Sequence, residues 1–362
     1  MGVLDCATLK KASQALYAID PSIVLYGEGW TADGSYDMAD KLGRRAVAAS
    51  CYTTLYPGQS DCPIGIGCFN SPGKQALKGE EHLGWGFMQK GADWSSSDKN
   101  AVTYMLNGHL KSDSLDYANP TQTVNYASCH DNYTNYDQMN YTLNYDVASK
   151  TASSIDSAEA MEASVASIAS VLFSEGIAFT QGGEELFRQK LLKVDDPYFD
   201  KADSGDYVTL EDGTKLMRNS YRYGDAVNSF KWDRKITYNP YYELLKKAGL
   251  ARAASLKDIL GRGYDATSPW GASGVTGWND AIDHGCGIAY QMGTSSNYYY
   301  GFLLGRINAT NYLSAGGSTQ IGMGSGTYQI VYSSKGRSGS IEVGADYKFT
   351  AYQNEFLLLK NF

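Results

Sequence analysis

Apolar positions along the chain recur with helical spacing in several segments. The first segment ends at Ile19, because the proline of Asp20-Pro21 disfavours a further helical residue before it. A longer stripe from Ser157 repeats at intervals of four, three and four residues, and Gly176 is well placed to end it. A last helix is predicted over residues 241–254, and shorter helical patterns cover 75–77 and 102–106.

Short apolar and β-branched runs lie between these helical segments. They are too short for helices and are bounded by glycine or proline, so they predict strands at residues 23–26, 64–69, 123–127 and 177–180. Strands that alternate with helices are typical of parallel α/β folds. The first part of the chain therefore predicts four βα units.

The pattern changes beyond about residue 256 to sequence rich in glycine, serine and tyrosine. Alternating runs at 298–304, 327–332, 340–343 and 355–359 are separated by turn signals such as Lys335-Gly336. This texture predicts an antiparallel β-sandwich. We expect two domains, with residues 1–255 in the α/β part and residues 256–362 in the sandwich.

Composition narrows the classes of partner. The chain has 362 residues, an apolar content of 43% and a net charge of −8, which argues against nucleic-acid and anionic-membrane partners and favours a neutral one. The 29 Tyr, 11 Phe and 6 Trp fit either sugar platforms or core and sheet positions. The six cysteines show no CxxC pairing, so no metal site is predicted and the only cofactor left open is calcium.

Two carboxylates stand where a βα barrel carries its chemistry. Glu28 lies in Leu-Tyr-Gly-Glu-Gly-Trp (25–30) and Asp131 in Asn-Tyr-Ala-Ser-Cys-His-Asp-Asn (125–132), each after a predicted strand. A pair of carboxylates is the machinery of glycoside hydrolysis. Taken singly, Glu28 is more often an exposed glutamate at a strand end, and Asp131 more often a helix cap or turn residue; the match to both motifs in order and spacing favours the functional roles.

These two segments resemble those of the type I pullulanases of the α-amylase superfamily. The resemblance continues through Gly-Ile-Ala-Phe-Thr-Gln-Gly-Gly-Glu-Glu (176–185) and Asn219-Ser220-Tyr221, and covers roughly residues 1–247. It implies an α/β fold in which the four units are the second half of a (β/α)8 TIM barrel. It also implies a retaining bacterial-type glycosidase of starch debranching, which cleaves α-1,6-glucosidic branch linkages in pullulan, starch or related α-glucans.

The resemblance assigns roles to individual residues. It makes Glu28 the general acid/base and Asp131 the transition-state stabiliser. The substrate-binding residues that it implies are Trp30, His130, Asn132, Tyr136 and Asp225. Asn135-Tyr136 replaces the usual Leu-Trp of the family, and for Asp225 a solvated loop aspartate is an equal alternative.

In the family the nucleophilic aspartate precedes a Leu-Met-Gly, so it is expected two residues before Met1. The isolated chain is then expected to be nearly inactive and, as a half barrel, to associate with itself. Two alternatives stay open: a non-catalytic α-glucan-binding module, and a debranching enzyme of isoamylase or limit-dextrinase specificity. The sequence shows no signal peptide and leaves the parent enzyme either extracellular or cytoplasmic.

Overall fold

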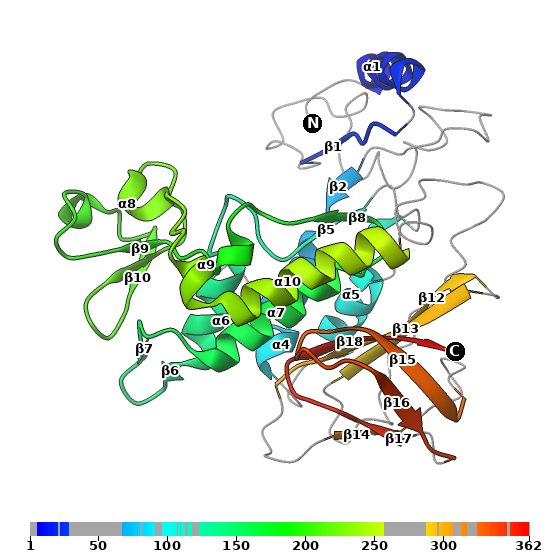
Figure 1. Ribbon diagram of the computed structural model, residues 1–362. Coiled ribbons are helices and arrows are strands. Elements are labelled where there is room, and N and C mark those ends of the chain that lie inside the picture. Colours follow the sequence, from blue (N-terminus) through cyan, green and yellow to red (C-terminus); the bar gives the residue numbers. More distant parts are fainter. Residues whose placement is uncertain are drawn as a thin grey trace.

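The computed structural model describes residues 6–20, 22–28, 67–79, 82–90, 96–106, 108, 110–112, 115–117, 123–256, 287–294, 297–306, 313–316, 324–345 and 348–361. Within these ranges, no helix combines the length and apolar character that a bilayer crossing requires. Figure 1 shows helices packed around a short parallel sheet, a small lobe on the left and antiparallel sheets at the lower right.

Four short strands form one parallel sheet. Its order is β1-β2-β5-β8, the order of these strands in the chain, and every pairing is parallel. The strands are β1 (Tyr26–Gly27), β2 (Gly67–Phe69), β5 (Thr123–Tyr126) and β8 (Ile177–Phe179). Three of the predicted runs are confirmed, because β2, β5 and β8 lie within them, and β1 shares only Tyr26 with the predicted run 23–26.

The connections between these strands carry most of the helices. The described helices are α1 (Cys6–Ile19), α3 (Ser71–Lys78), α4 (Phe87–Lys90), α5 (Ser96–Leu106), α6 (Asn135–Leu143), α7 (Ala158–Leu172), α8 (Asp225–Asn228), α9 (Arg234–Thr237) and α10 (Asn239–Ala251). A π-helical turn, η6 (Arg252–Leu256), continues α10. The predicted end of the first helix at Ile19 is confirmed.

Helix α7 is the central helix of this part. Ser157 caps its N-terminus by accepting a hydrogen bond from the Ala160 N–H. Its side chains are buried on all sides, because α7 contacts β5 and β8 as well as α6, α10 and a strand of the C-terminal sheet. The predicted stop at Gly176 is wrong by three residues: Phe173 is the C-cap, and Gly176, at a φ of 94°, leads into β8.

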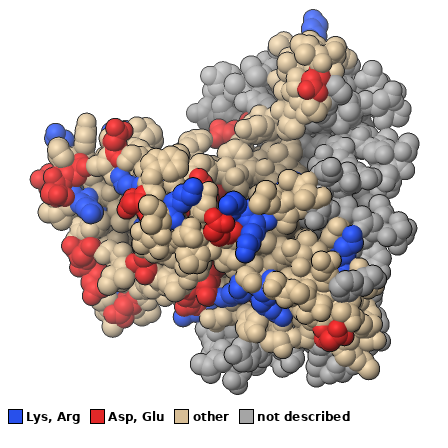
Figure 2. All heavy atoms as spheres, viewed as in Figure 1, with Lys and Arg blue, Asp and Glu red and all other residues tan. Residues whose placement is uncertain are grey.

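A small lobe inserted before α8 was not foreseen. It holds the antiparallel sheet β10-β11-β9 and the hairpin β6-β7 (Figure 1). Its strands are β6 (Tyr145–Asp146), β7 (Thr151–Ala152), β9 (Leu191–Leu192), β10 (Tyr207–Thr209) and β11 (Lys215–Met217); elsewhere, β3 (Leu110–Ser112) pairs with β4 (Leu115–Tyr117). Acidic side chains gather on this lobe in Figure 2. Its sequence carries the exposed Asp195, Asp200 and Glu211. Such a face disfavours a polyanionic partner.

The C-terminal part consists of antiparallel sheets. Five strands pair in the order β12-β13-β18-β15-β16, and two more form β14-β17. They are β12 (Gly287–Thr294), β13 (Asn297–Leu304), β14 (Leu313–Gly316), β15 (Gly326–Ser333), β16 (Ser340–Val343), β17 (Lys348–Ala351) and β18 (Glu355–Asn361). Phe349 of β17 packs on Phe302 of β13 with ring centroids 4.9 Å apart. The four predicted strands are confirmed, and β12, β14 and β17 were missed.

The five-stranded sheet also packs on the helices of the first part. Phe356 of β18 stacks on Phe173 at the end of α7, with centroids 5.2 Å apart and an interplanar angle of 9°. At the other end of α7, Arg306 Nε lies 3.0 Å from Glu159 Oε1. One hydrophobic core therefore runs from the helices into this sheet.

Candidate active site

Both predicted catalytic carboxylates follow strands of the parallel sheet. Glu28 comes directly after β1, and Asp131 lies on the loop between β5 and α6. Because parallel strands end at the same edge of their sheet, the two carboxylates reach the same side although 103 positions separate them in the chain. The fold thereby brings together the two motifs of the sequence.

Aromatic rings line one face of this sheet. Each strand contributes one ring: Tyr26, Phe69, Tyr126 and Phe179. Neighbouring centroids are 5.0 to 6.4 Å apart in edge-to-face arrangements. Phe69 and Tyr126 reach the pocket beside the carboxylates, so its wall combines flat apolar faces with polar groups.

The pocket has a volume of about 340 Å³. Its lining residues are Glu28, Phe69, Ser71, Lys74, Tyr126, Cys129, His130, Asp131, Asn132, Arg218 and Asn219. Polar and charged groups from the ends of β1, β2 and β5 and from the segment after β11 thus face a common space.

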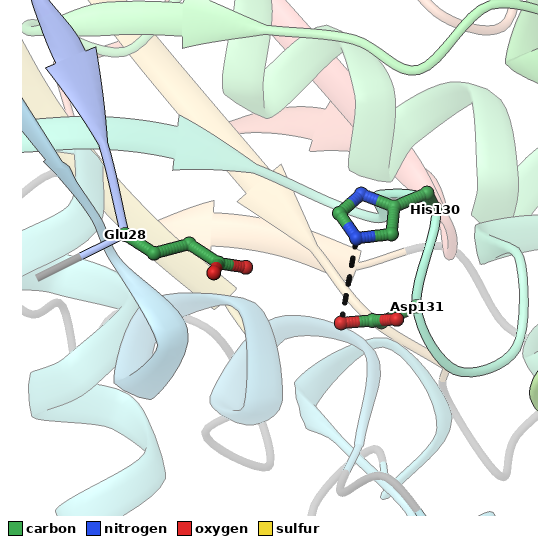
Figure 3. Close-up of side chains that lie close together, drawn as sticks. All are labelled: Glu28, His130 and Asp131. Carbon is green, nitrogen blue, oxygen red and sulfur yellow. Dashed lines mark ion pairs between the residues drawn. The ribbon is translucent and has the colours of Figure 1, made fainter. Parts of the chain in front are cut away.

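Glu28, His130 and Asp131 point toward one another in this space (Figure 3). One ligating atom of each lies within 4.8 Å of those of the other two. His130 Nε2 is 3.5 Å from Asp131 Oδ2, and these side chains are 77% and 50% exposed. Two carboxylates this close can act on one small group from two sides, while their exposure leaves them open to a ligand.

The same three residues are the group in the described part of the chain that could hold a metal ion. One imidazole and two carboxylates are ligands that several divalent cations accept. All three are exposed, however, and these three ligands by themselves do not make up a closed metal site.

Comparison with known proteins identifies the relationship. No family model matches the chain. The pullulanase of Bacillus subtilis (strain 168) is 25% identical over 243 residues, which make up 66% of this chain and 27% of that relative. The pullulanase of Klebsiella pneumoniae is 27% identical over 254 residues, 62% of this chain and 22% of that relative. The chain is similar to part of a pullulanase. It spans about a quarter of the length of these curated relatives.

Solved structures agree in fold. Apo pullulanase from Paenibacillus barengoltzii has a TM-score of 0.68 at 19% identity, with 99% of this chain and 46% of that chain covered. Pullulanase from Anoxybacillus sp. LM18-11 complexed with maltotriose has a TM-score of 0.63 at 22% identity, with 100% of this chain and 42% of that chain covered. These structures support an α/β fold with additional β-sheets for this chain.

The remaining predicted substrate residues lie in different environments. Asn132 lines the pocket in a left-handed conformation (φ 61°), and its N–H donates to Asn219 Oδ1 at 3.2 Å. Trp30 lies outside the described residues. Asp225 is exposed at the start of α8 and does not line the described pocket, because the Asn228 amide folds this loop onto itself by donating to the Ser220 carbonyl at 2.7 Å.

Tyr136 requires a correction. Its side chain is 2% exposed and lies in the core, where its hydroxyl donates to Asp156 Oδ1 at 2.7 Å and its ring packs on Phe187. The reason is that α6 begins at Asn135, so Tyr136 belongs to the first helical turn and faces the helix packing. The predicted contact between this ring and the substrate is wrong for this pocket.

Sequence inspection also missed two cations of the pocket wall. Lys74 is 3% exposed, with its ammonium 5.4 Å from the centroid of the Tyr126 ring. Arg218 places Nη1 3.0 Å from His82 Nδ1. Arg218 could have been found from its position directly before the family-like segment Asn219-Ser220-Tyr221. The sequence around Lys74 contains no comparable motif.

Beneath the pocket lies Glu184, which the helical pattern suggested only as a first-turn acid. It is 5% exposed, its Oε1 accepts a hydrogen bond from the Ser128 hydroxyl, and its Oε2 accepts from the Gln181 N–H at 3.1 Å. Burial raises its pKa to about 7, and burial lowers the pKa of nearby Lys78 to about 7. Glu184 thus holds Ser128, three residues before Asp131.

Proposed function

We propose that this chain carries part of the active site of a retaining glycoside hydrolase that cleaves α-1,6-glucosidic branch linkages in pullulan, starch or related α-glucans. One observation carries the proposal: Glu28 and Asp131, from the ends of β1 and β5, meet beside His130 in one pocket lined with aromatic rings. The pullulanase names of its relatives support the substrate class.

The chemistry assigns a role to each of the three side chains. Glu28 protonates the leaving glycosidic oxygen and later activates water, as the general acid/base of a retaining mechanism. Asp131 accepts hydrogen bonds from sugar hydroxyls and stabilises the oxocarbenium-like transition state, because its negative charge faces the developing positive charge. His130, whose Nε2 lies 3.5 Å from Asp131 Oδ2, donates a hydrogen bond to the same sugar ring.

We also propose a specific form of the α/β fold. The four consecutive parallel strands correspond to the second half of a (β/α)8 barrel, and residues 1–255 and 256–362 form two domains. The sequential order of the strands supports the first statement, because neighbouring units of such a barrel pair in chain order. The separate core between the C-terminal sheets supports the second.

We propose that this chain binds glucan without hydrolysing it. Glu28 and Asp131 are the two carboxylates that line the described pocket, and a retaining mechanism needs a nucleophile in addition to the roles assigned to them. This set of pocket residues also favours the second candidate function, a glucan-binding module that uses the same residues for contact only.

The test is calorimetric titration with maltotriose, the ligand named in the Anoxybacillus complex. We expect the unsubstituted chain to bind, and Asp131→Asn to weaken binding about tenfold, since a hydrogen bond to a charged group contributes about 1.5 to 3 kcal/mol. Asp195→Asn, on the exposed acidic lobe, is the matched control and should bind as the unsubstituted chain does. Equal affinities for all three proteins would refute the site.

A parallel assay measures reducing sugar released from pullulan. No release by the chain, together with maltotriose binding, is the expected result. Release that survives in Glu28→Gln would contradict the acid/base role, and release by the unsubstituted chain that Glu28→Gln abolishes would replace the binding-only proposal with an active enzyme.

A further inference from the structure

Lys190 is a lysine with no exposed surface, placed directly under the pocket. Its ammonium donates to three main-chain carbonyls: His130 at 3.1 Å, Asn132 at 2.6 Å and Arg218 at 3.1 Å. An ammonium has three N–H donors, so these bonds use its full capacity. The first two carbonyls flank Asp131, and the third belongs to the other segment that lines the pocket.

The segment that carries Lys190 is itself fixed to the start of α6. The Lys190 main-chain N–H donates to Asp137 Oδ2 at 3.0 Å, and the Thr134 hydroxyl donates to the Arg188 carbonyl at 2.7 Å. Thr134 also caps α6 by accepting from the Asp137 N–H. The lysine is therefore anchored on the helix that follows the Asp131 loop.

A merely space-filling role fits these contacts poorly. Burying an ammonium is costly, and burial lowers the pKa of Lys190 while buried Asp137 opposes that shift. An apolar side chain would fill the same volume without that cost, but it would leave the three carbonyls without their donor. What the ammonium adds is a fixed geometry for the loop that carries His130, Asp131 and Asn132.

We propose that Lys190 is a positioning residue for this site. Its ammonium fixes the main chain on both sides of Asp131 and links that loop to the main chain of Arg218. This linkage keeps the Asp131 carboxylate directed toward Glu28. The consequence for sugar binding rests on the proposed function. The ordering of the loop does not, and it can be measured without any sugar.

The experiment compares Lys190→Met with Lys78→Met by backbone ¹⁵N relaxation. Both substitutions remove a buried ammonium of the same size, but Lys78 donates to the Tyr133 carbonyl at 2.8 Å, the next carbonyl along the same loop, and not to the two carbonyls that flank Asp131. In Lys190→Met, we expect the order parameters of His130, Asp131 and Asn132 to fall from about 0.85 to below about 0.6. In Lys78→Met they should stay near the higher value.

Maltotriose titration of the same proteins provides the functional readout. Lys190→Met should bind at least about tenfold more weakly than Lys78→Met at matched global stability. Unchanged order parameters in Lys190→Met would overturn the proposal whatever the affinities. If the unsubstituted chain does not bind maltotriose while Lys190→Met disorders the loop, the proposed function fails and the positioning role stands.

A measurement on the unsubstituted chain covers the case in which Lys190→Met does not fold. The ammonium protons of Lys190 should exchange slowly with water and show scalar couplings across hydrogen bonds to the carbonyl carbons of His130, Asn132 and Arg218. An ammonium signal in fast exchange, without these couplings, would contradict the proposal directly.

Discussion

Buried charge and exposed charge lie next to each other around the pocket. Glu28, His130 and Asp131 are exposed, whereas Lys190 and Glu184 directly beneath them are buried. Buried ionisable groups persist where several hydrogen bonds satisfy them, which is the case for both residues. At the residue scale, the site consists of exposed side chains, two of which, His130 and Asp131, lie on a loop whose main-chain carbonyls accept hydrogen bonds from a buried ammonium.

Tyr136 offers a test of the difference between a core residue and a binding residue. Tyr136→Phe removes the hydrogen bond to the Asp156 carboxylate and keeps the ring, so the free energy of unfolding should fall by about 1.5 to 3 kcal/mol. Maltotriose affinity should be unchanged, because the ring is buried away from the pocket. Urea unfolding and calorimetric titration measure the two quantities, and a loss of affinity at unchanged stability would restore the substrate-binding role.

At the scale of elements, one buried amide joins strands to helices. The Asn125 side chain on β5 accepts from Asn70 Nδ2 at 3.0 Å, and its own amide donates to the carbonyls of Met105 and Glu175, both at 2.7 Å. These partners lie before α3, near the end of α5 and before β8. A single side chain thus fixes the positions of four segments relative to one another.

Replacing this amide should destabilise the whole α/β part. Asn125→Ala leaves one buried donor and two buried carbonyls without their partner, and we expect the free energy of unfolding to drop by about 3 kcal/mol or more. Ser154→Ala removes an exposed hydrogen bond to Asp212 and serves as the control, with a change within about 0.5 kcal/mol. Urea denaturation of both variants decides; equal midpoints would show that Asn125 does not have this role.

At the scale of the whole molecule, the helical part and the C-terminal sheet meet at a cluster of buried ionisable groups. Glu175 follows α7 and is 3% exposed, and Tyr290 of β12 donates its hydroxyl proton to the Phe173 carbonyl at 3.0 Å. Arg252 at the end of α10 donates to the carbonyls of Leu172 and Ser174. Burial raises the pKa of Glu175 to about 8, so this carboxyl is neutral in the folded chain at neutral pH.

This shift predicts a pH dependence of stability. The folded chain keeps the Glu175 proton between the ordinary pKa of 4.5 and about 8, where the unfolded chain has lost it. The contribution of Glu175 is therefore complete below pH 4.5, is lost as the pH rises and is constant again above about 8. Glu175→Gln mimics the neutral carboxyl, so it should nearly match the original chain at pH 4.5 and exceed its stability by roughly 4 kcal/mol at pH 8.5.

Urea unfolding of both proteins at several pH values measures this difference. Taking the difference between the two proteins removes the contributions of the other buried groups that titrate in this range, such as Lys78 and Glu184. A difference that is independent of pH would show that Glu175 ionises freely in the folded chain.

The sequence by itself determined the local elements and the two reactive motifs. Periodicity located the four parallel strands, α1, α7 and four strands of the C-terminal sheet, because hydrophobic spacing reflects which face of a segment is buried. The motifs supplied Glu28, His130, Asp131 and Asn132, which the structure brings to one pocket.

Only the tertiary structure decided what supports and completes that pocket. The contacts of Lys190 with Asn132, of Ser128 with Glu184 and of Asn132 with Asn219 join residues 58, 56 and 87 positions apart. Local sequence carries no trace of such pairs, because they arise when separate loops converge at one edge of the sheet. The same limit explains Tyr136: the motif supplies the ring, but the packing of α6 on α7 decides that the ring faces the core.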